Sequence, residues 1–355
     1  MQAVSAPSVS IIIPCRNEAD HIEACLRSIL AQDADGLAFE VIVADGMSDD
    51  GTREILRRLA AEDPRLIMID NPQQIVSTGL NLGIRSARGE VVLRMDVHTE
   101  YASDYLRQCL KVLEESGADN VGGPWVARGK GYVGRTIAAT FQSPFAVGGS
   151  RAHAADYEGP VDTVYLGCWK RDVFKRVGFF DEELVRNQDD EFNLRLVRAG
   201  GKIWQSPRIK SWYTARGSLG ALFRQYMQYG YWKVRVIQKH RMPASVMYLV
   251  PGVFVFTLLL LSAASIFLPL ARYGLALTAS AYVGALSIAS VVTAVRSQPS
   301  FLFLLPVVFA CFHFGFGIGF LHGVLDFLVL RRGPRAQFAA LTRQSPASRG
   351  NPAGV

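Results

Sequence analysis

The chain has few cysteines, and no two of them stand at a metal-binding or redox spacing. Five cysteines are dispersed over 355 residues, an odd number without any C-x-x-C motif. This pattern argues against a disulfide framework and favours free thiols in a reducing compartment. Zinc-finger spacings and RNA-recognition signatures are also missing, so nucleic acid is not predicted as a partner. The thiols belong to Cys15, Cys25, Cys109, Cys168 and Cys311.

The N-terminus lacks the basic stretch and apolar core of a secretory signal peptide. A β-branched apolar run begins almost at once, at Val9. We therefore expect the N-terminal part of the chain to stay in the cytoplasm.

Charged residues become scarce beyond Val246, whereas residues 1–241 have the mixed composition of a globular domain. Half of all residues are hydrophobic, which is high for a purely soluble enzyme. The formal net charge is +7, and a basic cluster directly precedes the apolar half. This position predicts contact with anionic lipid headgroups. The cluster consists of Lys233, Arg235, Lys239 and Arg241.

Three apolar stretches, 246–271, 273–295 and 301–330, are each long enough to cross a bilayer, for which about 20 residues suffice. Arg331, Arg332 and Arg335 follow the third stretch, in a segment (331–355) predicted to be a basic, disordered tail. Three crossings would put the two basic clusters on opposite faces, against the preference of cytoplasmic flanks for positive charge. A re-entrant first segment, which Pro251 and Pro269 leave open, would reconcile the charges.

The third stretch carries two notable sets of residues. Gly315, Gly319 and Gly323 form one close-packing face, whose neighbour is either internal or a second subunit, so a homo-oligomer is possible. His322 and Asp326 are four residues apart and share a helix face. A structural hydrogen bond and a role in proton or lipid handling are both open for this pair.

Strand and helix patterns alternate through the first part of the chain. Strands are predicted at 9–14, 39–44, 66–69 and 89–94, with helices between them. This alternation predicts an α/β domain, residues 1–207, with a mostly parallel sheet. Amphipathic interfacial helices are predicted at 208–245 and transmembrane helices at 246–330.

Polar clusters follow three of the predicted strands, at 14–18, 45–52 and 96–98. Ligands bind at the carboxyl ends of such strands, so we expect these clusters to meet at one edge of the sheet. Asp96 and His98 would point to the same side of an extended segment. A carboxylate and an imidazole can hold a divalent cation against a diphosphate, although an isolated D-x-H pattern is weak.

Several motifs in order resemble one known family. They are VSIIIPCRNE, DGMSDDGT from Asp45, N-x-G-x-x-x-A-x-G from Asn81, MDVH, GGPW ending at Trp125, and NQDDEFNLRLVRAGGKIW from Asn187. This ordered set resembles family 2 glycosyltransferases of the GT-A fold, and within them the ExoA-like membrane glucosyltransferases. The GT-A nucleotide-sugar-binding domain would cover the parallel sheet.

The resemblance implies roles for the polar clusters. Asp45 would contact the uracil of a nucleotide donor, with Pro14, Arg16 and Glu18 lining the same pocket; alternatively, Asp45 forms a turn. Ser48, Asp50 and Thr52 match the family but are predicted to cap the following helix. Gly167 matches the family's acceptor-side strand, which leads into the catalytic helix, and is predicted to contact the nucleotide sugar.

Asp96 matches the first aspartate of the family's D-x-D motif, and His98 replaces the last one. The resemblance implies that both ligate Mg²⁺ or Mn²⁺ beside the donor diphosphate. Asp189 matches the family's general base, with Gln188 in place of the usual glutamate. Acids in a first helical turn are also favoured by the helix dipole, which is the better interpretation for Glu191.

Residues 129–159, rich in glycine, predict a mobile segment, either a lid over the sugar or a flexible surface loop. The aromatic and basic stretch 208–241 predicts an amphipathic helix in the headgroup plane. Within it, Arg216 would hold the diphosphate or be a surface arginine. Trp125, Gln225 and Trp232 are predicted on the acceptor or membrane side.

These patterns predict an inverting glycosyltransferase, multi-pass in a bacterial inner membrane, with its catalytic domain in the cytoplasm. Its predicted donor is a UDP-hexose, with glucose favoured. Its predicted acceptor is a polyprenyl-diphosphate-linked saccharide, in exopolysaccharide or other surface-glycan assembly. Two alternatives are a transferase that charges polyprenyl phosphate directly and a non-catalytic nucleotide-sugar-binding membrane subunit.

Overall fold

The computed structural model describes residues 7–339 and divides them into two compact units. The first contains residues 7–125 and 154–213, and the second contains residues 126–153 and 214–339. The division differs from the predicted catalytic domain 1–207, because residues 126–153 belong with the C-terminal helices. Each unit is described by itself.

An eight-stranded sheet with the order β3-β2-β1-β4-β9-β6-β10-β8 forms the centre of the first unit. Strands β3, β2, β1 and β4 are parallel, and β9 runs antiparallel to its neighbours β4 and β6. The strands are β1 (Val9–Cys15), β2 (Phe39–Asp45), β3 (Leu66–Asp70), β4 (Val91–Arg94), β6 (Asn120–Gly123), β8 (Gly159–Pro160), β9 (Tyr165–Lys170) and β10 (Ile203–Gln205). A mostly parallel sheet is confirmed.

Both faces of this sheet are covered, which explains why its strands read as continuous apolar runs. Ile11 and Ile13 of β1 belong to one buried core, and Ile12 belongs to a second core, because successive side chains alternate across a strand. Each such fully buried side chain stabilises the fold by roughly 1.5–3 kcal/mol. The first unit's helices are α1 (Ile22–Leu30), α2 (Thr52–Glu62), α3 (Val76–Ser86), α4 (Tyr105–Ser116), α7 (Val173–Val177) and α8 (Gln188–Arg198).

A short antiparallel pair, β5 (Thr99–Tyr101) with β11 (Ser211–Thr214), follows the Asp96–His98 turn. The second unit contains β7 (Ala127–Arg128), α5 (Gly131–Thr140), α6 (Pro144–Val147), α9 (Leu219–His240), α10 (Val250–Ala264), α11 (Pro269–Arg296), α12 (Leu305–Gly323) and α13 (Ala336–Ala339). A π-helical turn, Val324–Val329, continues α12.

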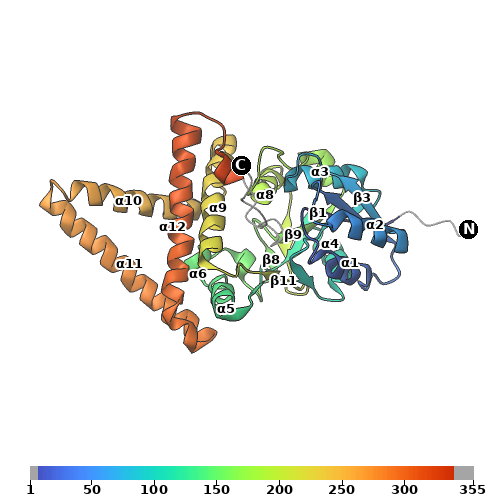
Figure 1. The fold of residues 1–355 in the computed structure, drawn as a ribbon, viewed down its shortest axis with the longest axis horizontal. Coiled ribbons are helices and arrows are strands. Elements are labelled where there is room, and N and C mark those ends of the chain that lie inside the picture. The colour runs from blue at the N-terminus through green and yellow to red at the C-terminus, as the bar shows by residue number, and fades with distance from the viewer. Residues whose placement is uncertain (1–6, 340–355) are drawn as a thin grey trace, which may run out of the picture. The chain divides into compact units, whose positions relative to one another are not determined.

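Helices α9 and α12 lie side by side in Figure 1, and three glycines allow their close approach. A Cβ added to Gly319 would lie 1.9 Å from the Met227 carbonyl oxygen, and one added to Gly323 would lie 2.7 Å from that of Tyr231. Gly315 contacts Phe223 in the same way, at 3.0 Å. The predicted glycine face is therefore occupied by α9 of the same chain.

Three helices, Val246–Ala264, Pro269–Arg296 and Leu305–Val329, are long and apolar enough to cross a membrane. Figure 1 shows α10 and α11 as the two arms of a V beside α12. Their apolar side chains face outwards, with Leu259 of α10 59% exposed and Leu277 of α11 73% exposed. Surfaces of this kind need lipid, so the protein associates with membranes.

The glycine-rich segment 129–159 contains two helices, and its predicted role as a lid stays a prediction. It forms α5 and α6, because its remaining apolar side chains find partners on α12. Phe141 packs against Phe312, and Phe145 packs against Phe309. The His313 ring contacts the Phe145 carbonyl oxygen through Nε2 at 2.8 Å.

The segment after the last apolar helix also differs from the predicted disordered tail. Asp326 is fully buried and accepts hydrogen bonds from Arg332 at 2.6 Å, Arg335 at 2.8 Å and the Tyr231 hydroxyl at 3.0 Å. Phe338 stacks on Tyr231 with ring centroids 4.0 Å apart. Residues 331–339 thus fold back onto α9, and the rest of the predicted tail lies outside the described residues. Of the two alternatives left open for Asp326, the structure shows the structural hydrogen bond.

Candidate active site

Two loops at the carboxyl edge of the sheet are joined by hydrogen bonds. The Asn17 amide donates to the Ser48 hydroxyl at 2.8 Å, and the Glu18 amide donates to the Thr52 hydroxyl at 2.8 Å. Asp50 accepts from the Ala19 amide at 3.1 Å. These contacts hold the loop after β1 against the loop after β2. Ser48, Asp50 and Thr52 therefore join the two loops. The predicted capping role is wrong, because the N-cap of α2 is Gly51 and that helix has no side-chain cap hydrogen bond.

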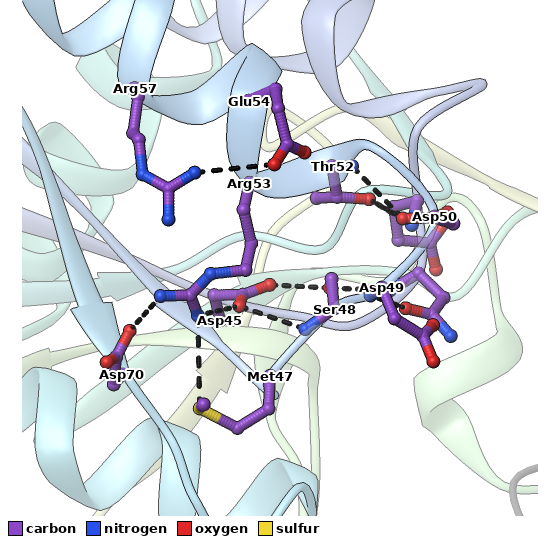
Figure 2. A network of polar contacts seen from close by, with 12 residues as sticks. Asp45, Met47, Ser48, Asp49, Asp50, Thr52, Arg53, Glu54, Arg57 and Asp70 are labelled. Atoms are coloured by element: carbon purple, nitrogen blue, oxygen red, sulfur yellow. Dashed lines mark hydrogen bonds and ion pairs between the residues drawn. The ribbon is translucent and has the colours of Figure 1, made fainter.

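Asp45 lies at the end of β2 and is fully buried (Figure 2). Its carboxylate accepts from the Ser48 hydroxyl at 2.6 Å and from Arg53 at 2.6 Å. Arg53 also donates to Asp70 at 2.8 Å, which ties β2 to β3. Asp45 thus forms the turn that was its alternative interpretation, and its predicted contact with uracil stays a prediction.

Pro14 and Arg16 lie at the same edge. Pro14 is paired with Ala44 in the sheet register. Arg16 packs over Gly46, where an added Cβ would lie 3.1 Å from the Arg16 Cβ. The missing side chain at Gly46 therefore lets Arg16 cross the turn that follows Asp45, as expected if Arg16 and Asp45 line one pocket.

Arg94 joins two carboxylates that the sequence predicts to belong to the site, Asp96 and Asp189. Its Nη1 donates to Asp189 at 2.5 Å, while Nε and Nη2 donate to the two oxygens of Asp96 at 3.0 and 3.1 Å. The Arg94 side chain is only 7% exposed. Burial would lower its pKa, but Asp189 and Asp96 raise that pKa above the ordinary arginine value. Arg94 therefore stays charged and holds both acids in place.

Asp189 lies in the first turn of α8, after Asn187, whose backbone is left-handed with φ 62°. Burial raises the pKa of Asp189; Arg94 opposes this effect, and the negative charges of Asp96 and Asp190 add to it. The net pKa is higher than that of an ordinary aspartate, which suits a carboxylate that must take up a proton. Glu191 instead is fully buried and paired with Arg195 at 2.8 Å, so its role is structural.

The Asp96–His98 turn is positioned by a tyrosine. The Tyr101 hydroxyl accepts from the Asp96 amide at 2.6 Å and donates to the Asp96 carbonyl at 3.0 Å. The turn brings His98 Nε2 to 2.7 Å from Glu18 Oε1. Glu18, His21 and His98 each offer a ligand atom, and these atoms lie within 4.8 Å of one another. Carboxylate and imidazole are a donor set that fits a divalent cation.

An aromatic group borders the same turn. Trp125 stacks on Tyr165 with ring centroids 5.2 Å apart, and Tyr213 meets Trp125 edge-on at 5.7 Å. The Tyr165 hydroxyl lies 2.7 Å from the Thr99 hydroxyl, just after His98. The predicted acceptor role of Trp125 stays a prediction.

Gly167 of β9 has φ +118°. A Cβ at this position would lie 2.3 Å from the Trp169 ring and 2.9 Å from the Asn120 side chain. Gly167 is therefore required by the fold of the strand, and its predicted contact with the donor stays a prediction.

Three predicted residues belong to the second unit. Arg216 donates to Gln225 at 3.0 Å, and Gln225 donates to the Tyr229 hydroxyl at 2.8 Å. Trp232 is 1% exposed and donates its indole N–H to the Phe338 carbonyl at 2.9 Å. Trp232 therefore packs α9 against the C-terminal segment, which leaves it no surface for an acceptor.

Arg94, His21 and Tyr165 were not singled out from the sequence. One signal was available for Arg94, because it interrupts the apolar run Val91–Met95. A charge inside a buried strand needs a partner, and this one has two. His21 and Tyr165 carried no comparable signal.

Comparison with known proteins identifies the family. The profile of Glycosyl transferase family 2 matches residues 10–178. Succinoglycan biosynthesis protein ExoA of Rhizobium meliloti (strain 1021) is 35% identical over 240 residues, which cover 67% of this chain and 72% of that protein. The chain belongs to glycosyltransferase family 2.

Two further similarities extend over most of this glycosyltransferase. A dolichyl N-acetyl-alpha-D-glucosaminyl phosphate 3-beta-D-2,3-diacetamido-2,3-dideoxy-beta-D-glucuronosyltransferase of Methanococcus voltae is 26% identical over 89% of this chain and 97% of the relative. The mannosyltransferase PcManGT of Pyrobaculum calidifontis, solved in complex with GDP-Man and Mn²⁺, superposes with a TM-score of 0.59 over 89% of this chain and 87% of its own. The two proteins share 22% of their residues, so this likeness supports the fold alone.

Proposed function

We propose that the protein is an inverting hexosyltransferase that moves a hexose, with glucose favoured, from a UDP-sugar to a polyprenyl-diphosphate-linked saccharide. The observation that carries this proposal is the arrangement of Asp96 and Asp189 around Arg94. Asp96 follows β4, and Asp189 lies in the first turn of α8. Both lie at the carboxyl edge of the sheet, where a nucleotide sugar binds in this fold.

Asp189 would act as the general base. It takes the proton from an acceptor hydroxyl while that oxygen attacks the anomeric carbon opposite the leaving diphosphate. This single displacement inverts the anomeric configuration and needs no covalent intermediate. Arg94 orients Asp189 and keeps it ionised, so we assign Arg94 as a positioning residue.

A divalent cation, Mg²⁺ or Mn²⁺, neutralises charge on the departing nucleoside diphosphate when it is bound. The side chains that would hold it are His98 and Asp96, which lie on one turn. The bound Mn²⁺ and GDP-Man of the Pyrobaculum calidifontis enzyme support both a nucleotide-sugar donor and a metal. Pro14, Arg16 and Asp45 would contact the uracil.

The acceptor is assigned from the exposed apolar helices α10 and α11, which anchor the protein in lipid. We place the protein in a bacterial inner membrane, multi-pass, with its catalytic unit in the cytoplasm, where UDP-sugars are made. The similarity to a succinoglycan biosynthesis protein supports a role in exopolysaccharide assembly.

The test is UDP release by the purified protein in lipid, across a panel of UDP-sugars and lipid-linked saccharides. Polyprenyl phosphate without a saccharide is tested as a second acceptor in the same assay. Asp189→Asn should lower the rate roughly 10²–10⁴-fold, the contribution of a general base. Asp190→Asn removes the next acid of the same helical turn and should retain activity.

Equal rates for wild type and Asp189→Asn would overturn the assignment of the base. UDP release with polyprenyl phosphate as the sole acceptor would overturn the proposed saccharide acceptor and favour direct charging of the lipid carrier. The anomeric configuration of the product, read by NMR, tests inversion directly.

A further inference from the structure

Three potential metal ligands from separate parts of the chain converge beside the candidate active site. Glu18 follows β1, His21 directly precedes α1, and His98 lies in the turn after β4. The Glu18 carboxylate lies 2.7 Å from His98 Nε2 through one oxygen and 3.8 Å from His21 Nδ1 through the other. The two imidazole rings meet edge-on with centroids 5.1 Å apart.

The composition of this group selects among cations. Two imidazole nitrogens and one carboxylate oxygen suit first-row transition metals, whereas Mg²⁺ prefers oxygen ligands and retains its waters. Each oxygen of Asp96 accepts from Arg94, so Asp96 could join this group only through a remaining lone pair. Cys25 is not a competing ligand, because burial, with smaller effects from Asp96 and Glu18, raises the pKa of its thiol to about 12.

The backbone around the group is already fixed. The His21 amide donates to the Glu18 carbonyl at 2.9 Å, so one turn sets the spacing of these two ligands. The Glu18 amide is held by Thr52, and Tyr101 holds the turn that carries His98. Only side-chain adjustments remain for the three groups to surround an ion.

The group is also accessible. The side-chain exposure is 14% for Glu18, 22% for His98 and 58% for His21. An ion bound to three protein ligands on this side would keep open positions towards solvent. Such positions are what a diphosphate oxygen needs in order to bind the same ion.

We infer that Glu18, His21 and His98 form a site for a first-row transition-metal dication, which would make Mn²⁺ rather than Mg²⁺ the ion of this enzyme. The inference rests on the proposed function for the role of the ion, because the site borders the predicted diphosphate position. The site shares His98 with the predicted metal pair of Asp96 and His98, and it adds Glu18 and His21 from the loop after β1.

The experiment measures ion binding without any nucleotide sugar. Full-length protein in lipid nanodiscs is titrated with Co²⁺, followed by its visible absorption, and with Mn²⁺, followed by electron paramagnetic resonance. Wild type should bind one ion, with affinity rising from Mn²⁺ to Co²⁺ and with Mg²⁺ as a poor competitor. His21→Ala and His98→Ala should each weaken Co²⁺ binding about tenfold or more.

His240→Ala is the matched control, since it removes an imidazole from the end of α9 and should leave Co²⁺ binding unchanged. Glu18→Gln provides a conservative variant, and circular dichroism verifies the folding of each protein. Equal Co²⁺ affinities for wild type and a folded His21→Ala protein would overturn the three-ligand site. Effective competition by Mg²⁺ at equal concentration would overturn the selectivity.

The two proposals fail separately. If UDP release depends on Asp189 while His21→Ala binds Co²⁺ as wild type does, the transferase stands and the three-ligand site falls. If Co²⁺ binds through the two histidines while no UDP-sugar is consumed, the site stands and the proposed reaction falls.

Discussion

Arg94 donates to Asp189 at 2.5 Å although 95 residues separate them in the sequence. The contact joins the end of β4 to the start of α8. Because the same guanidinium also binds Asp96, the donor side and the acceptor side of the proposed reaction share one buried charge.

Replacement of Arg94 should change the pH dependence of transfer. Asp189 acts in its ionised form, which is lost as the pH falls through its pKa. That pKa is already raised, and Arg94 lowers it, so Arg94→Gln should raise it further. We expect the acid limb of the kcat/KM profile to move upwards by roughly 1–3 pH units, the effect of one close opposite charge.

Arg94→Lys keeps a positive charge and should shift the acid limb less. Arg57→Gln is the control. It removes an exposed arginine that lies 3.4 Å from Glu54 (Figure 2), and it should leave the pH profile unchanged. A profile of Arg94→Gln that coincides with wild type would refute the coupling.

Loss of Asp96 should be severe even when metal is abundant. Asp96→Ala removes the partner that holds Arg94 beside Asp189 and a proposed ligand of the diphosphate ion. The rate of UDP release should fall roughly 10²–10³-fold at saturating Mn²⁺, as for other groups that stabilise developing charge. Unchanged turnover would remove Asp96 from the mechanism.

A methyl group at Gly319 should separate α9 from α12. The new Cβ would lie 1.9 Å from the Met227 carbonyl, so Gly319→Ala should destabilise the protein by about 1–3 kcal/mol through overpacking. Gly284 of α11 has no neighbour within 4 Å of an added Cβ. Gly284→Ala should therefore be neutral or stabilising, by up to about 1 kcal/mol.

Thermal unfolding of the two glycine variants in detergent compares them directly. A midpoint for Gly319→Ala equal to that of Gly284→Ala would show that the two helices are not packed as described.

Removal of the Asp326 carboxylate should release the segment that follows α12. Asp326→Ala leaves Arg332 and Arg335 without their buried partner, so we expect faster tryptic cleavage after these arginines. Arg331→Gln, at an exposed neighbouring position, is the control. Cleavage of Asp326→Ala at the wild-type rate would contradict the anchoring role.

Much of the first unit follows from sequence pattern. Runs such as Val9–Pro14 and Phe39–Ala44 are apolar because both sheet faces are covered, and they became β1 and β2. Asp189 was predicted as the general base by resemblance to the family and Glu191 as a first-turn acid favoured by the helix dipole. The structure adds that Glu191 pairs with Arg195.

Other features depend on contacts that no local pattern encodes. The frequent glycines of residues 129–159 predict mobility, yet Phe141 and Phe145 pack against α12. Phe145 and His313, which are in contact, are 168 residues apart in the sequence. His21 similarly gains meaning only when the loop after β1 meets the turn after β4. Such long-range packing overrides local propensity.

The register between α9 and α12 has a consequence for membrane topology. Phe223, Met227 and Tyr231 meet Gly315, Gly319 and Gly323 in the same order, so both helices run in one direction. Their C-terminal ends meet where Gln238 donates to the Phe327 carbonyl at 2.9 Å. The basic residues before α10 and those after α12 therefore lie at the same end of the helix pair, which is the arrangement that the alternative of a re-entrant first segment requires.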